Sequence, residues 1–319
     1  MAALLARLWE RPALLLWLPP AFWAGNLVIG RALGAGFPPV SLAVGRWVVA
    51  LAALAPFVAA AAWRQRALLV RHWRLVAACG AFGIAGYNAL GYLALQTTSA
   101  TSVAFINSTL PLMVPIAAFA LGAERVRPRT LLGIVLSFAG VAWIVGRGDP
   151  ASLVHLRIAG GEALVLVAVA NYALYSALLR RRPAALEPLV FLAATMVTGL
   201  VVLLPFWIWE LARGATIPTD PGAVAAVLYI GLFASLIAFI VWNRCVATLG
   251  AAVTGVSFHL VAAFTAVLAF LVLGEAVAGF HLVGIGLILT GFAMATMRAG
   301  PRAGAHARPA GRSDPGSMR

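Results

Sequence analysis

Runs of about 20 apolar residues, each long enough to cross roughly 30 Å of hydrocarbon as a helix, follow one another along almost the whole chain. Only 10% of the residues are charged, against about 25% in a soluble domain, so the chain cannot cover its surface in water. The alternating pattern of barrel strands is absent, which argues against an outer-membrane barrel. The sequence therefore predicts an all-α polytopic membrane protein.

The charges and turn residues between the apolar runs divide the chain into ten predicted transmembrane helices. These helices cover approximately residues 13–33, 40–62, 75–95, 101–121, 129–146, 158–179, 188–209, 222–243, 251–273 and 280–297. Residues 147–157 form a predicted linker between the fifth and sixth helices. Residues 298–319 are rich in Gly, Pro, Ala and Arg and are predicted to form a disordered cytoplasmic tail.

Arginine placement predicts the topology, because basic residues near the ends of spans gather on the cytoplasmic side. With the N-terminus in the cytoplasm, 18 of the 23 arginines fall in inner segments and only three fall in outer loops. We therefore expect a multi-pass protein of the cytoplasmic (inner) membrane of a bacterium, with both termini in the cytoplasm. Since the arginines follow this topology, the net charge of +14 does not indicate nucleic-acid binding.

The chain also repeats itself at an offset of 151 positions. The clearest matches, among eleven identities in 43 positions, are Glu124 with Glu275, Gly133 with Gly284 and Gly140 with Gly291. Each copy, residues 1–146 and 158–297, holds five predicted helices, and an odd number makes the second copy enter the membrane from the opposite side. The sequence thus predicts two inverted five-helix repeats, an arrangement typical of transporters that work by alternating access.

The repeated glycines lie seven residues apart in the fifth helix and again in the tenth, so each pair forms a stripe along one helix face. Such stripes allow helices to approach closely. The sequence leaves two arrangements open: the stripes meet within one chain, or they meet between the two chains of a homodimer.

Several short motifs resemble proteins of the EamA type in the drug/metabolite transporter (DMT) superfamily. These motifs are Phe22-Trp23-Ala24-Gly25-Asn26 followed by Arg31, Pro38 and Arg46, then Ala170-Asn171-Tyr172-Ala173-Leu174-Tyr175 running into Arg180, and the glutamates Glu124 and Glu275. The resemblance covers residues 13–297 and implies a ten-helix, basket-like exporter of amino acids or other small metabolites. It also implies a central cavity lined mainly by helices 1, 3, 4, 6, 8 and 9. One departure is the absence of proline from His259–Ala263 in the ninth helix, where the family often has one.

Polar and aromatic side chains within the spans are candidate substrate ligands, because polar groups in hydrocarbon are costly unless they face a partner or a cavity. The candidates that share helix faces are Trp23 and Asn26 in helix 1, Tyr87, Asn88 and Tyr92 in helix 3, Asn171, Tyr172 and Tyr175 in helix 6, and Ser235, Phe239 and Trp242 in helix 8. A cavity of aromatic, amide and hydroxyl groups suits an amphipathic or zwitterionic solute. The alternative for each residue is a hydrogen bond to a neighbouring helix or a place in an interfacial aromatic belt.

The fourth and ninth helices carry a further group of candidates. Pro111 and Pro115 lack the amide hydrogens that would bond the carbonyls four residues before them, so they predict a kink and a role in gating. Asn107 and Ser108 make the stretch before the kink polar, and His259 aligns with Ser108 at the repeat offset. These three are candidate substrate ligands, and His259 is a candidate proton relay. A static kink and a neutral histidine bonded to a carbonyl are the alternatives.

Two arginines, Arg31 and Arg46, lie within predicted spans toward their outer ends. Snorkelling to the outer interface is the simplest expectation for both, which would make them charges at the outer lip of the cavity. Attraction of a substrate carboxylate is the alternative.

No acidic residue falls in the middle of a span, which argues against the usual carboxylate proton relay and favours a facilitator or exchanger. We also find no catalytic or metal-binding motif, so no catalytic residue, metal site or cofactor is expected. The leading hypothesis is a secondary transporter in the lipid bilayer that exports a small-molecule substrate, with amino acids as the favoured class. The alternatives are a membrane-embedded enzyme acting on lipid-linked substrates and a non-transporting membrane scaffold.

Overall fold

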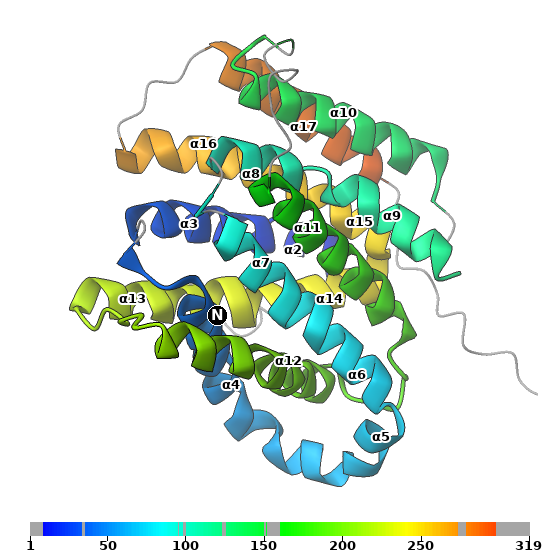
Figure 1. Cartoon of the computed structure of the whole chain (residues 1–319). Helices are drawn as coiled ribbons and strands as arrows, with labels where there is room; N and C mark the ends of the chain where they lie inside the picture. The colour runs from blue at the N-terminus through cyan, green and yellow to red at the C-terminus, as the bar shows by residue number, and fades with distance from the viewer. Residues whose placement is uncertain are drawn as a thin grey trace, which may run out of the picture.

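The computed structural model describes residues 9–33, 36–94, 96–97, 100–122, 126–149, 151, 160–273 and 279–297, and its regular structure in these ranges is all helical. Figure 1 shows the helices gathered in one bundle. The six long uninterrupted helices are α3 (Leu18–Leu33), α4 (Pro39–Arg64), α10 (Pro128–Val145), α11 (Gly160–Leu178), α12 (Pro188–Ala212) and α17 (Gly279–Thr296). Three short helical pieces accompany them, namely α2 (Pro12–Leu15), α5 (Arg66–Arg71) and η4 (Leu179–Arg181).

The remaining helices are interrupted within their length. Two of them contain a π-helical segment, in the series α6 (Trp73–Cys79), η2 (Gly80–Gly86), α7 (Tyr87–Ala94) and in the series α13 (Pro221–Tyr229), η5 (Ile230–Ile237), α14 (Ala238–Leu249). The other two are broken into α8 (Ala100–Asn107) and α9 (Leu110–Ala120), and into α15 (Ala251–Val256), the 3₁₀ turn η6 (Ser257–His259) and α16 (Leu260–Leu273).

In the described part of the chain, eight helical stretches are long and apolar enough to cross a membrane. Two shorter apolar helices, Phe105–Ala120 and Ala251–Thr265, correspond to the predicted fourth and ninth spans. The prediction of an all-α membrane protein is therefore confirmed, while the number of ten spans stays a prediction. Glu124, Glu275 and the tail at 298–319 lie outside the described residues, as does most of the linker at 147–157.

Local sequence explains where several helices begin. Proline occupies the first turn of α4, α10, α12 and α13, where its missing amide hydrogen costs no helical hydrogen bond. At α13, the carboxylate of Asp220 also accepts a hydrogen bond of 3.0 Å from the amide of Ala223. Gly250, with a φ of +95°, separates α14 from α15 in a conformation that other residues rarely adopt.

Polar contacts hold α4 and α12 together at both ends. Near the start of α4, the carboxylate of Glu210 accepts hydrogen bonds from the amides of Val40 and Ser41, at 2.9 and 2.7 Å. A carboxylate is favoured there because a helix N-terminus carries partial positive charge. At the other end, the side chain of Gln65 donates to Glu187 at 2.6 Å and accepts from its amide at 3.0 Å.

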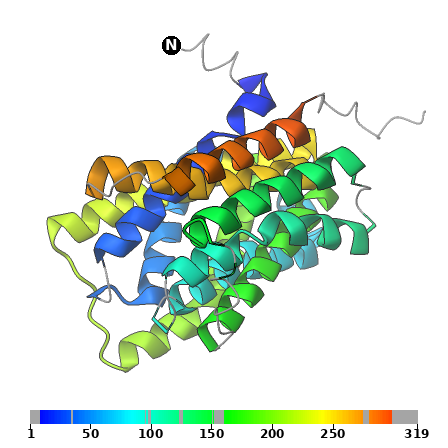
Figure 2. The same cartoon turned by 90° about the horizontal axis from the view of Figure 1, so that it is seen from above.

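The two glycine stripes meet within one chain, which resolves the arrangement that the sequence leaves open. A Cβ atom on Gly133 would lie 2.5 Å from the carbonyl oxygen of Gly291, and one on Gly140 would lie 2.6 Å from that of Gly284. Because the pairing runs in opposite directions along the two helices, α10 and α17 are antiparallel. They lie side by side at one end of the bundle, as Figures 1 and 2 show from two directions.

The π-helical segments are the feature that sequence patterns did not predict. η2 and η5 occupy almost the same place in the two copies, since Gly80–Gly86 shifted by 151 positions gives residues 231–237. A π turn leaves carbonyl groups without their usual helical partners and is frequently found at functional sites. Here the Asn88 amide donates to Ile84 at 2.9 Å, and the Ser235 hydroxyl donates to Ile230 at 2.8 Å.

Candidate functional site

Arg46, on α4, connects the π-helical segment η5 with α7, the helix that follows η2. The residue is 3% exposed. Its Nε donates to the Ser235 hydroxyl at 2.6 Å, and its Nη2 donates to the Ala234 carbonyl at 3.1 Å. Its Nη1 donates to Asn88 Oδ1 at 2.8 Å and to the Tyr92 hydroxyl at 2.9 Å. These four hydrogen bonds use four of the five N–H groups of the guanidinium. All four partners are neutral, so they do not compensate its positive charge.

The expectation that Arg46 snorkels to the outer interface is wrong. The side chain points into the bundle, where its neighbours offer a set of oxygen acceptors that hydrocarbon does not provide. The backbone carbonyl of Ala234 in η5 is one of them, and the side chains of Asn88 and Ser235 supply others. Arg31 lies on α3, but its side chain is outside the described part of the structure.

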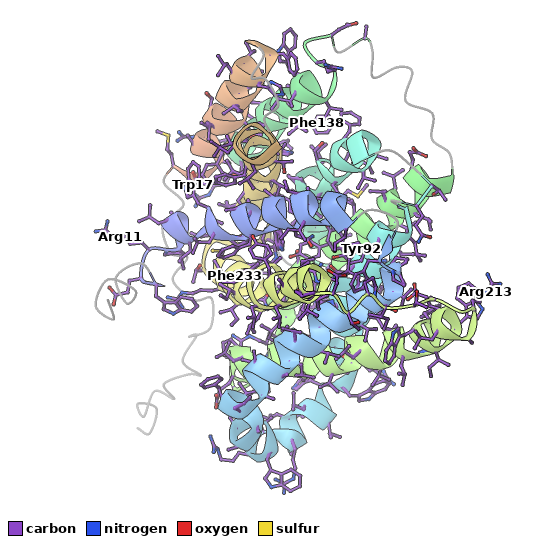
Figure 3. The ribbon with its side chains drawn as sticks, turned by 90° about the vertical axis from the view of Figure 1, so that its left-hand side faces the viewer. Arg11, Trp17, Tyr92, Phe138, Arg213 and Phe233 are labelled. Carbon is purple, nitrogen blue, oxygen red and sulfur yellow. The ribbon has the colours of Figure 1, made fainter. Side chains whose placement is uncertain are left out.

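The polar network around Arg46 brings together candidates from three helices. The Tyr92 hydroxyl, which accepts from Arg46, also donates to Asn26 Oδ1 on α3 at 3.4 Å. Asn88 is fixed by its own bond to the carbonyl of Ile84, so its oxygen is held toward the guanidinium. In Figure 3, Tyr92 lies inside the bundle, whereas Arg213 projects at its edge.

An aromatic cluster lies directly against this network. Trp23 Nε1 donates at 2.9 Å to the carbonyl of Ala234, the same group that accepts from Arg46. The Trp23 ring contacts those of Trp242 and Tyr172, with centroids 5.2 and 6.0 Å apart. Tyr172 in turn contacts Tyr87 at 4.7 Å. The cluster therefore joins α3, α7, α11 and α14 in the interior.

Some polar atoms of the aromatic cluster have no hydrogen-bond partner among the described residues. They are Trp47 Nε1, Tyr172 Oη and Trp242 Nε1, which belong to side chains that are completely buried. A buried donor without a partner costs free energy, and such groups often mark a place that a ligand or water completes. The cluster thus offers both an apolar surface and hydrogen-bond donors that have no partner among the described residues.

Helix α11 contributes two further candidates through close packing on η2. The Tyr175 ring covers Gly83, where a Cβ would lie 2.4 Å from the ring, and its hydroxyl donates to Asn243 Oδ1 at 2.8 Å. The Asn171 amide lies beside Gly86, where a Cβ would be 2.7 Å away. These glycines let α11 approach the π turn, which sets the position of both side chains.

The break between α8 and α9 forms a separate polar group. The Ser108 and Thr109 hydroxyls donate to backbone carbonyls one turn earlier, at 2.5 and 2.6 Å. The Ser108 carbonyl accepts a hydrogen bond of 2.9 Å from His259 Nε2. His259 is 1% exposed, and its Nδ1 has no partner among the described residues. Ser108 and His259, aligned by the repeat, therefore touch each other.

The other candidates of the fourth helix surround this break. Pro111 lies in the first turn of α9, where proline is tolerated, and Pro115 lies inside that helix. Asn107 is the last residue of α8 and is half-buried. The break is linked to the aromatic cluster by Phe258, next to His259, whose ring centroid lies 5.3 Å from that of Trp23.

Sequence patterns missed Trp47 and Asn243, although both carry recognisable signs. Trp47 follows Arg46 directly and is fully buried, with its ring 4.8 Å from Phe239. Asn243 is an amide within an apolar span and is the acceptor for Tyr175. The carbonyl of Ala234 could not be found from sequence, because only the π turn makes it available to Arg46 and Trp23.

Long apolar helices, a polar network around a buried cation and an adjoining aromatic cluster define a polytopic membrane protein with a polar and aromatic interior. Comparison with known proteins specifies the class further. The chain matches the EamA-like transporter family over residues 11–146 and again over residues 159–297. It belongs to this family, within the DMT superfamily, and is a membrane transporter of that type.

Several relatives are similar over much of their length. An uncharacterized transporter of Archaeoglobus fulgidus is 28% identical over 290 residues, which cover 89% of this chain and 97% of the relative. A probable terminal-alkyne amino-acid exporter of Streptantibioticus cattleyicolor is 29% identical over 277 residues, covering 86% of this chain and 90% of the relative. The uncharacterized transporter YyaM of Bacillus subtilis is 29% identical over 213 residues, covering 66% and 69%.

The fold also resembles that of a solved crystal structure. The two share 21% sequence identity with a TM-score of 0.71, and the similarity covers 91% of this chain and 98% of the other. At this identity the likeness concerns the fold alone.

Proposed function

We propose that this transporter exports small organic metabolites that carry a carboxylate, with amino acids as the leading class. The substrate would bind between Arg46 and the aromatic cluster. The observation that carries this proposal is the buried guanidinium of Arg46, whose four hydrogen-bond partners are all neutral.

Electrostatics favours an anionic group beside Arg46. A buried charge is costly unless an opposite charge accompanies it, and ionisable groups inside membrane proteins commonly mark solute pathways. A carboxylate would supply the missing charge and match the planar guanidinium by two parallel hydrogen bonds. The network would have to release one present partner, since a carboxylate needs two N–H groups and four of the five are already bonded.

The aromatic cluster suits the remainder of an amino-acid substrate. Its rings offer apolar surface to a side chain, and the unpartnered donors of Tyr172 and Trp242 are available to polar substrate atoms. Asn26 and Asn88 lie in the same network and offer amide oxygens that an ammonium group can use. The name of the Streptantibioticus cattleyicolor relative, an amino-acid exporter, points to the same substrate class.

The proposal includes ten spans in two inverted repeats, residues 1–146 and 158–297, that alternate around the site. Under a two-fold axis, equivalent residues touch each other only where the axis passes between them. Two hydrogen bonds join residues separated by the repeat offset of 151, His259 to Ser108 and Ser137 to Ile288. The paired π segments and the two matches to the family support the same symmetry.

The glycine contacts of α10 and α17 fit this axis as well. The two-fold operation exchanges Gly133 with Gly284 and Gly140 with Gly291. It therefore converts the contact of Gly133 with Gly291 into the contact of Gly284 with Gly140, and both contacts are present. Inverted repeats of this kind can exchange inward-facing and outward-facing conformations around a central site.

Differences between the two copies suggest where gating occurs. Pro111 and Pro115 stand in the first copy where the second has Ala262 and Ala266. We therefore assign a gating role to the break between α8 and α9, which the Ser108 and His259 contact would couple to the second copy. The protein would act in the cytoplasmic membrane of a bacterium with both termini inside, as the arginine distribution predicts.

Counterflow in proteoliposomes tests the substrate class. Vesicles loaded with an unlabelled amino acid would take up the labelled form, and we would compare a panel of amino acids with the amines that lack the carboxylate and with amphipathic cations. Saturable uptake restricted to carboxylates is expected. Equal uptake of the amines would contradict the role of Arg46, and no uptake together with a copurifying lipid-modifying activity would favour an enzyme.

A further inference from the structure

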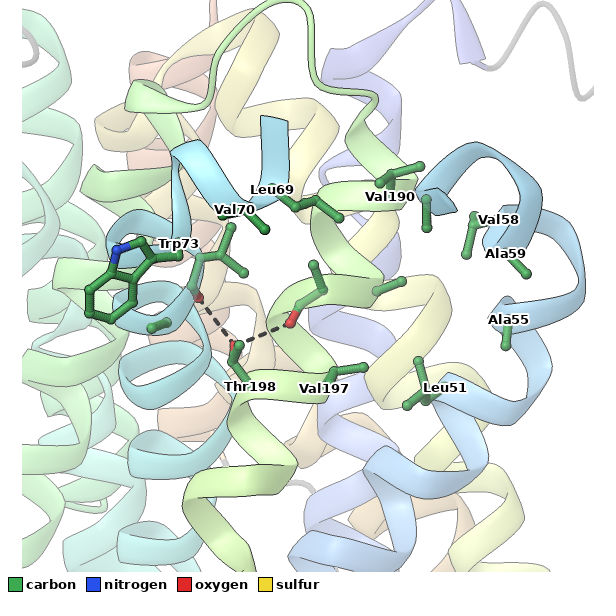
Figure 4. Close-up of a pocket in the computed structure, with 15 residues that line it drawn as sticks. Leu51, Ala55, Val58, Ala59, Leu69, Val70, Trp73, Val190, Val197 and Thr198 are labelled. Carbon is green, nitrogen blue, oxygen red and sulfur yellow. Dashed lines mark hydrogen bonds between the residues drawn. The ribbon is translucent and has the colours of Figure 1, made fainter. Parts of the chain in front are cut away.

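An open apolar cavity lies away from the proposed transport site, between α4, α6 and α12, with α5 closing one end (Figure 4). Its volume is about 490 Å³, within the range of roughly 300–1,000 Å³ that is usual for small-molecule sites. The lining is made almost entirely of Ala, Val and Leu side chains. Its one hydroxyl, that of Thr198, bonds to the carbonyls of Val76 and Ala194 at 3.2 and 3.1 Å.

The closed end of this cavity carries a group of exposed arginines. Arg64 follows Ala62 of the lining by two residues, and Arg74 follows Trp73 directly. Arg66 and Arg71 are the first and last residues of α5, which carries Leu69 and Val70 of the lining. Arg66 stacks on exposed Trp63 at 4.6 Å, and Arg74 lies 5.7 Å from the ring centroid of exposed Trp73. Tryptophan beside arginine is typical of the membrane–water interface. The carboxylate of Glu187 in this corner already accepts from Gln65.

The length of the cavity matches one leaflet of the bilayer. Its lining on α4 extends from Leu51 to Ala62, a rise of about 16 Å of helix at 1.5 Å per residue. Half of a hydrocarbon core of roughly 30 Å is about the same length. A chain that enters beside the arginines would therefore end near the middle of the membrane.

From these observations we propose that the cavity binds one anionic glycerophospholipid. One acyl chain fills the cavity, and the phosphate headgroup pairs with Arg64, Arg71 and Arg74. The apolar lining disfavours a polar solute, because its only hydrogen-bonding side chains are Trp73 and Thr198, and the Thr198 hydroxyl is already bonded to backbone carbonyls. The cluster of arginines distinguishes an anionic lipid from a neutral one, since basic groups at this depth attract negative headgroups.

Native mass spectrometry of protein taken from vesicles of equal phosphatidylglycerol and phosphatidylcholine tests this proposal. The full chain is expected to retain phosphatidylglycerol in preference to phosphatidylcholine. The combined change Arg64→Gln, Arg71→Gln and Arg74→Gln should lower that preference by more than ten-fold, because each arginine attracts the negative headgroup. Arg213→Gln removes an exposed arginine that lies on Trp209 elsewhere and should leave the preference unchanged.

A second pair of variants separates the cavity from ordinary lipid contact. Ala55→Phe fills the cavity and should lose the retained lipid whatever its headgroup, whereas Ala52→Phe changes an exposed residue of the same helix outside the lining. Equal retention by these two variants would overturn the proposal, as would an equal retention of both lipids by the unchanged protein. The arginine variant alters only exposed side chains, so its lipid preference tests the proposal even if Ala55→Phe does not fold. Neither measurement depends on transport.

Discussion

Replacing Arg46 by methionine tests the central element of the proposed site. The change removes the guanidinium and keeps an unbranched apolar side chain in its place. A substrate carboxylate would then be buried without its counter-charge, which costs about 2–5 kcal/mol. At 1.4 kcal/mol for each factor of ten, this corresponds to a loss of roughly 30-fold to several thousand-fold in apparent affinity.

The same change should have little effect on folding. Four hydrogen bonds are lost, each worth about 1 kcal/mol or somewhat more with a charged donor, but an uncompensated buried charge is removed as well. The neighbours keep partners, since Asn88 still donates to Ile84 and Ser235 to Ile230. We therefore expect thermal stability close to that of the unchanged protein, as measured by the melting temperature in detergent.

Counterflow of an amino acid and of its decarboxylated amine gives the decisive comparison. Arg46→Met should abolish exchange of the amino acid and leave any exchange of the amine as it was. Arg46→Lys keeps the charge without the planar pair of donors and should lie between the two. Exchange of the amino acid by Arg46→Met at the normal rate would refute the role of Arg46. A loss of both stability and all exchange in Arg46→Met and in Arg46→Lys would also refute it, because the residue would then be structural.

Three further predictions concern packing, helix termini and the site. Gly140→Ala should destabilise the protein by about 1–3 kcal/mol, because the new methyl group meets a carbonyl of α17. Gly286→Ala is the control and should not destabilise the protein, because the space around Gly286 is open. Equal melting temperatures for the two variants would contradict the packing of α10 on α17. Glu210→Gln should lower stability by about 1–3 kcal/mol, since a charged acceptor at the N-terminus of α4 is lost, and an unchanged thermal unfolding curve would show that the contact is unimportant. Tyr175→Phe, which removes only the hydroxyl bonded to Asn243, and Asn107→Ala should each impair counterflow while expression and size-exclusion profile stay normal. Unaffected transport in both would remove them from the site.

The membrane class and the family follow from local features of the sequence. Long apolar runs can satisfy their backbone only as helices in a bilayer, so the helical positions depend little on distant contacts. The glycine stripes predict a close approach between helices for a similar reason, because small residues permit such an approach by any partner helix. The offset of 151 also pairs Ser108 with His259, which the fold brings into contact.

The direction of the Arg46 side chain could not be predicted from the sequence pattern. Its distance from the end of the span predicts snorkelling, and in an isolated helix that would be the favourable solution. The structure instead surrounds it with Asn88, Tyr92, Ser235 and the Ala234 carbonyl, residues up to 189 positions away in the chain. Two of these acceptors, Ala234 and Ser235, lie in the π turn η5, which packs against α4, and no local pattern specifies that packing.

Composition and spacing along the chain were therefore enough to predict the membrane environment, the approximate positions of the helices, the repeat and the residue types available for a site, because the physical cause of each is local. Three features became known from the packed helices: Arg46 faces inward, Trp23 and Arg46 donate to one carbonyl, and α10 meets α17 within the chain. Each of these depends on which distant groups supply a hydrogen-bond acceptor or a free surface, and that is known only once the helices are packed.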